Sequence, residues 1–248
     1  MSLENKIYNC CKCSIASLVQ IEHLQHLQQL QHMIIIPSIL VQSKEEYIKQ
    51  IQAVQSVVDM IQLDIADGKF VPNITWADPD VVEQYTNIDV ELHLMVQNPL
   101  EEIKKWTNIK NIKRILIHAE SDFDFPLITD HLSSKNIELG IVLNPNTPLS
   151  VLKPYIEQIT TVMFMGVYPG FQGQNLIPEV LEKIVEFNSE YSNIFTEIDG
   201  AVNFDTLPDI IQTEVKAICP GSAIFGNGNP ADNIEKMKEI INKLTNNK

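Results

Sequence analysis

Short apolar runs recur at regular intervals from residue 33 onward in this 248-residue chain, and they restrict its fold more than any other feature. Their starts lie roughly 20 to 33 residues apart, which is the length of a strand plus a crossover helix. Such spacing is typical of parallel strands joined by helices. The expected strands are Ile34–Leu40, Met60–Ile65, Val90–Val96, Arg114–His118, Ile137–Leu143, Thr161–Val167, Asn193–Ile198 and Val215–Ile218.

The segments between these runs have helical features, such as a serine cap with glutamate in the first turn, or proline near the start. Eight strand-then-helix units predict an α/β fold, a (β/α)₈ TIM barrel. A doubly wound open sheet is the alternative, but it usually has fewer units and often carries G-x-G-x-x-G after the first strand, which is absent here. The expected helices are Ser43–Val58, Pro99–Trp106, Pro148–Glu157, Pro178–Glu190, Asp205–Gln212 and Pro230–Leu244.

Residues 1–32 differ in character from the rest and predict an appended tail, either mobile or loosely helical. Leucine repeats there every three residues within a glutamine-rich stretch, a spacing that drifts around a helix without forming a stable stripe. We therefore expect the catalytic barrel domain to span residues 33–248.

Three of the four cysteines crowd the tail, so the chain has no disulfide framework. Cys11 and Cys13, followed by His23 and His26, could in principle bind zinc, but this spacing matches no common zinc site.

The net charge of −14 argues against a nucleic-acid partner, because there is no basic surface to neutralise phosphates. A small phosphorylated substrate stays possible, since backbone N–H groups can hold a phosphate. No apolar run approaches the roughly 18 residues of a membrane span, and the N-terminus lacks a secretory pattern. These features predict a cytoplasmic protein with no membrane partner.

Asp64 and Asp199 each close a predicted strand and are soon followed by glycine. A carboxylate at the end of a buried strand costs folding energy unless something compensates it. Two of them, far apart in sequence but both at the catalytic end of a barrel, predict an acid and a base that face one substrate. The alternative is two unrelated turn aspartates, since Asp-Gly is a common turn pair.

His93 alternates with Met95 on one face of its strand, as Gln62 does with Asp64. Asp64, His93 and Asp199 can therefore converge at the barrel mouth as a divalent-metal site. A lone histidine in an apolar strand is more often a core residue, but two strand-end aspartates favour the metal site. His118 has only Glu120 for company, and we expect it to be structural.

Small residues follow the last three strands and predict a phosphate seat in the usual loops of such barrels. Ordinary loop glycines are the alternative. The clusters are Gly170-Phe171-Gln172-Gly173-Gln174, Gly200-Ala201 and Gly221-Ser222.

Together these segments resemble the ribulose-phosphate 3-epimerase family, in family order over residues 34–226. The strings D-G-x-F-V-P-N, starting at Asp67, and P-G-F-x-G-Q, starting at Pro169, are highly specific in combination. The other matching segments are Ile36–Leu40, Asp64–Thr75, His93–Val96, Leu143–Pro148, Ile198–Gly200 and Gly221–Phe225.

The resemblance implies a ribulose-phosphate-binding type of barrel that interconverts D-ribulose 5-phosphate and D-xylulose 5-phosphate. Asp64 and Asp199 would exchange the C3 proton, and the family's divalent metal would be held by Asp64, His93 and Asp199. The implied partner is a phosphorylated ketose, and the family's usual oligomers imply self-association. The implied substrate-binding residues are Ser38, His93, Met95, Met165, Gly170, Phe171, Gln172, Gly173, Gly200, Ala201, Gly221 and Ser222.

The chain departs from the family pattern at Gln62, where the family has a metal-binding histidine. A glutamine oxygen is a poorer ligand for zinc or iron than imidazole. Among zinc, iron, manganese and cobalt, the usual choices, this favours manganese, or else magnesium, if Gln62 ligates the ion.

Ala66 stands where the family has methionine, and Tyr168 replaces a common asparagine or glutamate. These changes leave open a six-carbon ketose phosphate as substrate. The loss of a metal-binding histidine at Gln62 leaves open a non-catalytic sugar-phosphate-binding barrel. A decarboxylase of a related barrel group is disfavoured, because its D-x-K-x-x-D string is absent.

Overall fold

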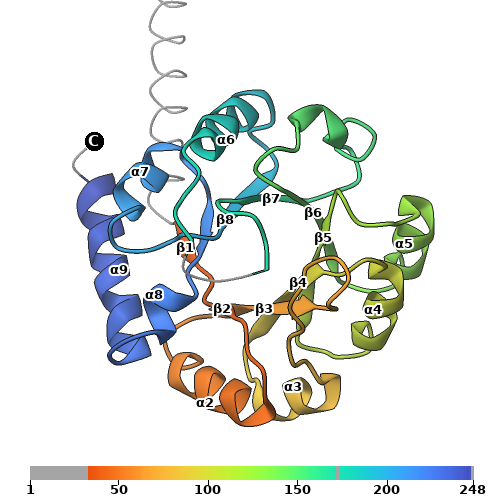
Figure 1. The fold of residues 1–248 in the computed structure, drawn as a ribbon, viewed down its shortest axis with the longest axis horizontal. Coiled ribbons are helices and arrows are strands. Elements are labelled where there is room, and N and C mark those ends of the chain that lie inside the picture. The colour runs from red at the N-terminus through yellow and green to blue at the C-terminus, as the bar shows by residue number, and fades with distance from the viewer. Residues whose placement is uncertain (1–32, 171–173, 247–248) are drawn as a thin grey trace, which may run out of the picture.

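The computed structural model describes residues 33–170 and 174–246, which form one parallel sheet surrounded by helices (Figure 1). The order of the strand segments within it is β1-β9-β8-β7-β6-β5-β4-β3-β2. Their bounds are β1 Ile34–Ile35, β2 Ser38–Ile39, β3 Met60–Ala66, β4 Asp89–Met95, β5 Ile112–His118, β6 Glu138–Leu143, β7 Thr161–Met165, β8 Phe195–Asp199 and β9 Ala217–Cys219.

The first predicted strand closes the sheet into a barrel, because its two halves pair with opposite ends of the strand order. Ile34 and Ile35 of β1 pair with β9, whereas Ser38 and Ile39 of β2 pair with β3. Pro37 lies between the halves and has no N–H to donate, so the ladder is interrupted where the partner changes. The (β/α)₈ barrel predicted from the sequence is confirmed.

Helices follow most strands and lie outside the barrel in Figure 1. Ser43 caps the first of them as predicted, because its Oγ accepts from the Glu46 N–H at 3.2 Å. The helices are α2 Lys44–Val54, α3 Pro79–Tyr85, α4 Pro99–Trp106, α5 Phe125–Leu132, α6 Glu179–Glu190, α7 Leu207–Gln212, α8 Ser222–Phe225 and α9 Pro230–Thr245, with a 3₁₀ turn, η1, at Leu149–Leu152.

The α-helix predicted for Pro148–Glu157 was wrong, since only the short η1 forms there. Pro154 explains the difference, because proline removes a helical hydrogen bond and disfavours helical backbone at the residue before it. Three short helices were missed, α3, α5 and α8. The first two begin with an aspartate cap, Asp78 or Asp124, whose side chain accepts a backbone N–H of the first turn.

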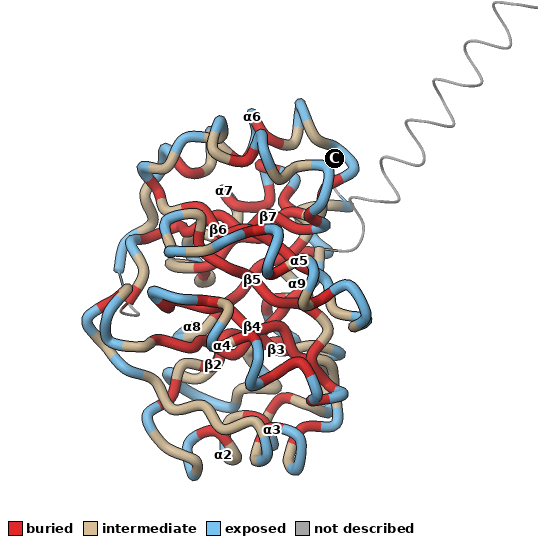
Figure 2. The backbone as a smooth tube through the Cα atoms, turned by 90° about the vertical axis from the view of Figure 1, so that its right-hand side faces the viewer, coloured by how far each residue is buried: buried red, intermediate tan, exposed pale blue. Residues whose placement is uncertain are grey.

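Most of the core falls into two parts that the barrel wall separates. The larger part lies between the strands and the outer helices, and Figure 2 shows the buried strands at the centre with exposed segments outside them. The smaller part fills one side of the barrel interior with residues such as Leu116, Val142 and Met163. Most of the polar side chains inside the barrel come from β3, β4, β5 and β8, and they include Gln62, Asp64, His93, His118 and Asp199.

Residues 1–32 lie outside the described part of the chain, and with them the predicted tail and the Cys/His zinc alternative. Among the described residues, no helix combines the length and apolar character needed to cross a bilayer.

Candidate active site

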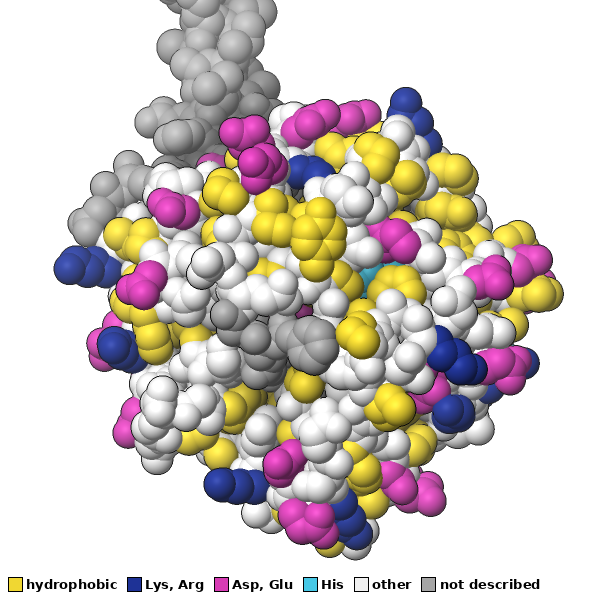
Figure 3. Space-filling view, in the orientation of Figure 1, with side chains coloured by type: hydrophobic (Ala, Val, Ile, Leu, Met, Phe, Trp, Pro, Cys, Tyr) yellow, Lys and Arg dark blue, Asp and Glu magenta, His cyan; other side chains and the backbone are white. Residues whose placement is uncertain are grey.

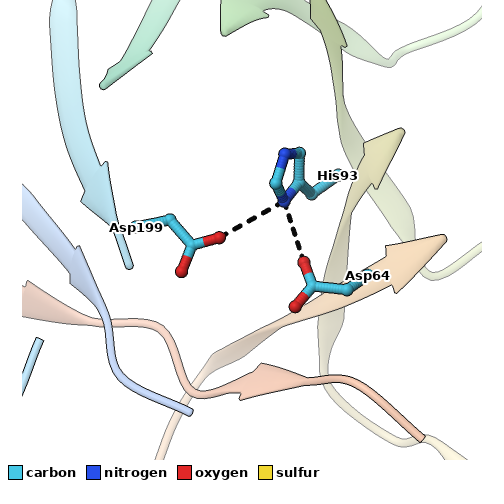
Figure 4. Close-up of side chains that lie close together, drawn as sticks. All are labelled: Asp64, His93 and Asp199. Atoms are coloured by element: carbon cyan, nitrogen blue, oxygen red, sulfur yellow. Dashed lines mark hydrogen bonds and ion pairs between the residues drawn. The ribbon is translucent and has the colours of Figure 1, made fainter. Parts of the chain in front are cut away.

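Three predicted site residues meet at the C-terminal end of the strands (Figure 4). Asp64 of β3 pairs in register with His93 of β4, and Asp199 is the last residue of β8 on the far side of the barrel. The Nδ1 atom of His93 lies 2.9 Å from Asp64 Oδ1 and 3.3 Å from Asp199 Oδ2. The imidazole therefore bridges the two carboxylates.

Burial and neighbouring charges shift the pKa values of the ionisable groups in this cluster. Asp64 is 3% exposed and His93 is fully buried. Burial raises the pKa of Asp64, and the nearby charge of Asp199 raises it further. Burial alone would lower the pKa of His93, but hydrogen bonds with Asp199 and Asp64 and the charges of both raise it to about 10. The imidazole is thus held as a cation between two carboxylates.

Gln62 places its amide nitrogen at the centre of the same cluster. Its Nε2 donates to Asp64 Oδ1 at 2.7 Å and to Asp199 Oδ2 at 3.0 Å, and it lies 3.4 Å from His93 Nδ1. Its Oε1 is buried and has no hydrogen-bond partner among the described residues. An orphaned buried carbonyl is costly, so this side chain is poised for a ligand that would satisfy it.

His118 contacts the cluster from the next strand, a contact that its sequence context does not predict. Its Nε2 lies 2.9 Å from His93 Nε2, and its Nδ1 lies 3.3 Å from Glu120 Oε2. Burial lowers the pKa of His118 to about 4, which keeps this ring neutral beside the cationic His93. The expectation that Glu120 is its sole partner was wrong, because the contact with β4 depends on strand register.

A cavity of about 190 Å³ opens above Asp64 and Asp199. Ten predicted site residues line it, whereas His93 is absent from the lining. Phe171, Gln172 and Gly173 lie outside the described residues. The predicted residues in the lining are Ser38, Asp64, Met95, Met165, Gly170, Gly200, Ala201, Gly221 and Ser222, together with Asp199.

The lining of the cavity suits an anion held by backbone rather than by cationic side chains. No Lys or Arg is among the described lining residues, and in Figure 3 these side chains lie toward the edge of this face. Gly200 and Ala201 have positive φ angles of 94° and 57°. A Cβ at Gly200 would lie 2.6 Å from Val167 Cγ2, so this tight turn requires glycine.

A family model described as the ribulose-phosphate 3 epimerase family matches residues 34–225. The chain belongs to this family. It is 31% identical to ribulose-phosphate 3-epimerase of Helicobacter pylori (strain J99) over 86% of this chain and 100% of that protein. It is also 31% identical to the enzyme of the same name from Bacillus subtilis, over 73% of this chain and 86% of the relative.

Solved structures with low sequence identity share the fold. The 3-hexulose-6-phosphate synthase of Salmonella typhimurium is similar with a TM-score of 0.65 at 11% identity, covering 86% of this chain and 100% of that one. Orotidine 5′-monophosphate decarboxylase from Sulfolobus solfataricus has a TM-score of 0.61 at 10% identity, covering 86% and 99%. These similarities show only that the barrel fold is shared.

The departures from the family pattern have distinct positions in this epimerase-family barrel. Ala66 packs with Val71 and Met95, and Tyr168 is half-exposed; neither is among the described residues that line the cavity. Gln62 is thus the one departure, among these, that touches the carboxylate cluster.

The donor set fits a divalent metal ion. One ligand atom from each of Asp64, His93 and Asp199 lies within 4.8 Å of the others. Turning the Gln62 amide would bring its orphaned Oε1 to the place that Nε2 now occupies, between both carboxylates. A set with several oxygens and a single nitrogen suits hard or borderline ions.

Proposed function

We propose that this family member interconverts D-ribulose 5-phosphate and D-xylulose 5-phosphate, with Asp64 and Asp199 as the acid and base. The observation that carries the proposal is the approach of two strand-end carboxylates, through one imidazole, beneath a cavity lined by small residues. Members of the family named ribulose-phosphate 3-epimerase cover most of this chain.

The reaction needs a proton removed from one face of C3 and another delivered to the opposite face. One aspartate accepts the C3 proton, the C–H electron pair forms a C2–C3 double bond, and the carbonyl π pair moves onto the C2 oxygen, giving an enediolate. The other aspartate then donates a proton from the opposite side. The raised pKa of Asp64 suits this role, because a stronger base abstracts a weakly acidic proton more readily.

Residues around the two aspartates hold them for this exchange. Ser38 Oγ donates to Asp64 Oδ2 at 2.5 Å, which leaves Oδ1 facing His93 and Gln62. Met95 and Met165 line the cavity and exclude water from the reacting carbon. The backbone around Gly200-Ala201 and Gly221-Ser222 would hold the phosphate at the other end of the substrate.

A divalent ion held by Asp64, His93 and Asp199, with Gln62 Oε1 as a further ligand, would stabilise negative charge developing on the substrate oxygens. With Gln62 as a ligand, we expect manganese or magnesium to be favoured over zinc. Metal analysis and titration of the purified protein test this preference. Stoichiometric, tightly held zinc would contradict it, and Gln62→His should raise zinc affinity.

Incubation with ribulose 5-phosphate in deuterated water tests the reaction. With added manganese, we expect deuterium at C3 and the appearance of xylulose 5-phosphate, both followed by NMR. Zinc and EDTA arms report the metal requirement. A protein that binds the sugar phosphate but exchanges nothing with any of these ions is a non-catalytic binding protein, and the proposal then fails.

A parallel assay with a six-carbon ketose 6-phosphate tests the alternative substrate. A higher kcat/KM for the hexose would transfer the proposal to that substrate. Self-association and a cytoplasmic location stay predictions, which sedimentation analysis and cell fractionation test.

A further inference from the structure

Both nitrogens of the His93 ring are engaged, and they face different partners. Nδ1 faces Asp64 and Asp199. Nε2 lies 2.9 Å from Nε2 of His118, whose ring stacks beside it with centroids 5.1 Å apart. Two ring nitrogens at this distance share one proton, so one donates and the other accepts.

A metal ion on Nδ1 of His93 would decide which ring donates. A metal-bound imidazole nitrogen carries no proton, so the one ring proton of His93 would lie on Nε2. His93 would then donate and His118 would accept, which puts the proton of a neutral His118 on Nδ1, facing Glu120.

His118 is itself held from two directions. Glu120 Oε2 lies 3.3 Å from its Nδ1, and Glu120 Oε1 accepts from the Asn144 N–H at 3.1 Å and from the Thr147 hydroxyl. The ring of Phe70 packs against His118 with centroids 4.7 Å apart. The β5 and β6 loop residues thereby fix a ring that itself never reaches the carboxylates.

We propose that His118, oriented by Glu120, is a positioning residue that fixes the proton and ring orientation of His93, so that His93 Nδ1 is aimed at the metal ion. The proposal rests on the proposed function only in assuming a metal at Asp64, His93 and Asp199. Partners that orient a metal-binding histidine in this way typically change metal affinity about 10- to 100-fold when removed.

Three variants of the full-length protein separate positioning from packing. His118→Phe keeps an aromatic ring against Phe70 but cannot accept from His93. His118→Gln restores an acceptor in a side chain of similar reach. Glu120→Ala leaves both rings in place and removes the group that orients His118. His131→Gln, at a histidine whose ring contacts Thr107 instead, is the matched control.

The first measurement is the Mn²⁺ dissociation constant by calorimetry, without substrate. We expect about 10- to 100-fold weaker binding for His118→Phe, partial recovery for His118→Gln, a smaller loss for Glu120→Ala and no change for His131→Gln. Because no substrate is present, a failure of the epimerase assay leaves these results untouched.

The second measurement is the tautomeric state of His93 and His118 from ¹⁵N-histidine NMR of the protein saturated with Mg²⁺, which is diamagnetic. Wild type should show His118 protonated on Nδ1 alone, and Glu120→Ala should lose this preference. The proposal is overturned if His118 carries its proton on Nε2, or if wild type does not bind Mn²⁺. Wild-type Mn²⁺ affinity in both His118→Phe and Glu120→Ala would overturn it as well; if His118→Phe does not fold, Glu120→Ala alone decides.

Discussion

The barrel interior holds two buried polar clusters that use similar residues for different purposes. The mouth cluster is Gln62, Asp64, His93 and Asp199. The base cluster is Glu91, Arg114 and Glu197, nearer the N-terminal ends of the strands, with the half-exposed Glu138 at its edge. Two strands contribute to both clusters, since Glu91 precedes His93 by two residues on β4, and Glu197 precedes Asp199 by two on β8.

The clusters differ in the cation that holds their carboxylates. In the base cluster Arg114 donates to Glu91 Oε2 at 2.9 Å, to Glu138 Oε2 at 2.8 Å and to Glu197 Oε1. A register shift in the β4–β5 ladder sets Arg114 opposite Glu91. In the mouth cluster the cation is an imidazole, whose charge depends on a proton.

This difference distinguishes a cluster with a structural role from one that is suited to catalysis. Glu91, Glu197 and Cys219 have ligand atoms spaced as a metal site would have them, yet a guanidinium that keeps its proton already lies among the carboxylates. The mouth cluster can exchange its proton for a metal ion or a substrate proton, and it opens into the cavity. A buried carboxylate in this barrel is therefore suited to catalysis where its counter-charge can be exchanged.

The largest expected effect concerns the two carboxylates of β8, Asp199 in the mouth cluster and Glu197 in the base cluster, each neutralised in a separate variant. Asp199→Asn removes a proposed acid or base, so we expect turnover of ribulose 5-phosphate to fall by about 1,000-fold. Glu197→Gln, two residues earlier, should keep turnover within a few-fold of wild type. Steady-state kinetics with circular dichroism as a folding check measure both. Equal losses in the two variants would place the base cluster in the chemistry.

Removing Arg114 tests the role of the base cluster. Arg114→Met leaves buried carboxylates without their cation, so we expect the free energy of unfolding to fall by about 3–5 kcal/mol. Urea unfolding measures this, and Mn²⁺ affinity should not change. Lys104→Met, which removes an exposed ion pair with Glu101, is the control and should change stability by less than about 1 kcal/mol. An Arg114→Met protein as stable as wild type would contradict a structural role for the base cluster.

The sequence pattern predicted the residues of the mouth cluster better than those of the base cluster, for a physical reason. Asp64 and Asp199 stand at strand ends before glycine, where a carboxylate is conspicuous. Glu91, Arg114 and Glu197 lie inside strands, and there alternating charges resemble a solvated face. They are buried because a barrel turns that face inward, which depends on closure of the whole sheet.

Contacts between strands also limited what could be predicted from the sequence at the candidate active site. His93 was predicted from its alternation within one strand, whereas the role proposed for His118 depends on the rotation of two adjacent rings. The orphaned Oε1 of Gln62 likewise follows from three-dimensional packing, although its replacement of a family histidine was visible in the sequence. Local pattern thus identified the groups, and their partners needed the folded geometry.

The two clusters should also differ in how stability depends on pH. Burial raises the pKa of Glu91 to about 7, from an ordinary value of 4.5, although the charge of Arg114 opposes this. The folded state therefore holds a proton that the unfolded state releases between these values, so the free energy of unfolding should fall as pH rises from about 4.5 to 7. Glu91→Gln should flatten this slope in urea unfolding of the EDTA-treated protein. Glu101→Gln, an exposed control on α4, should keep the wild-type slope.

The smallest effect concerns the hydrogen bond that orients Asp64. Ser38→Ala removes a donor to Asp64 Oδ2, and hydrogen bonds to charged groups contribute about 1.5–3 kcal/mol, so we expect turnover to fall about tenfold or somewhat more. In the wild type this bond lowers the pKa of Asp64. Its loss should therefore raise that pKa and move the acidic limb of the pH–rate profile to higher pH. Ser121→Ala, whose hydroxyl donates to the Val96 carbonyl at 2.8 Å, is the matched control and should leave that limb in place. A Ser38→Ala enzyme with reduced turnover but an unmoved limb would mean that Ser38 acts by packing against the substrate, and Asp64 would then owe its basicity to burial and Asp199 alone.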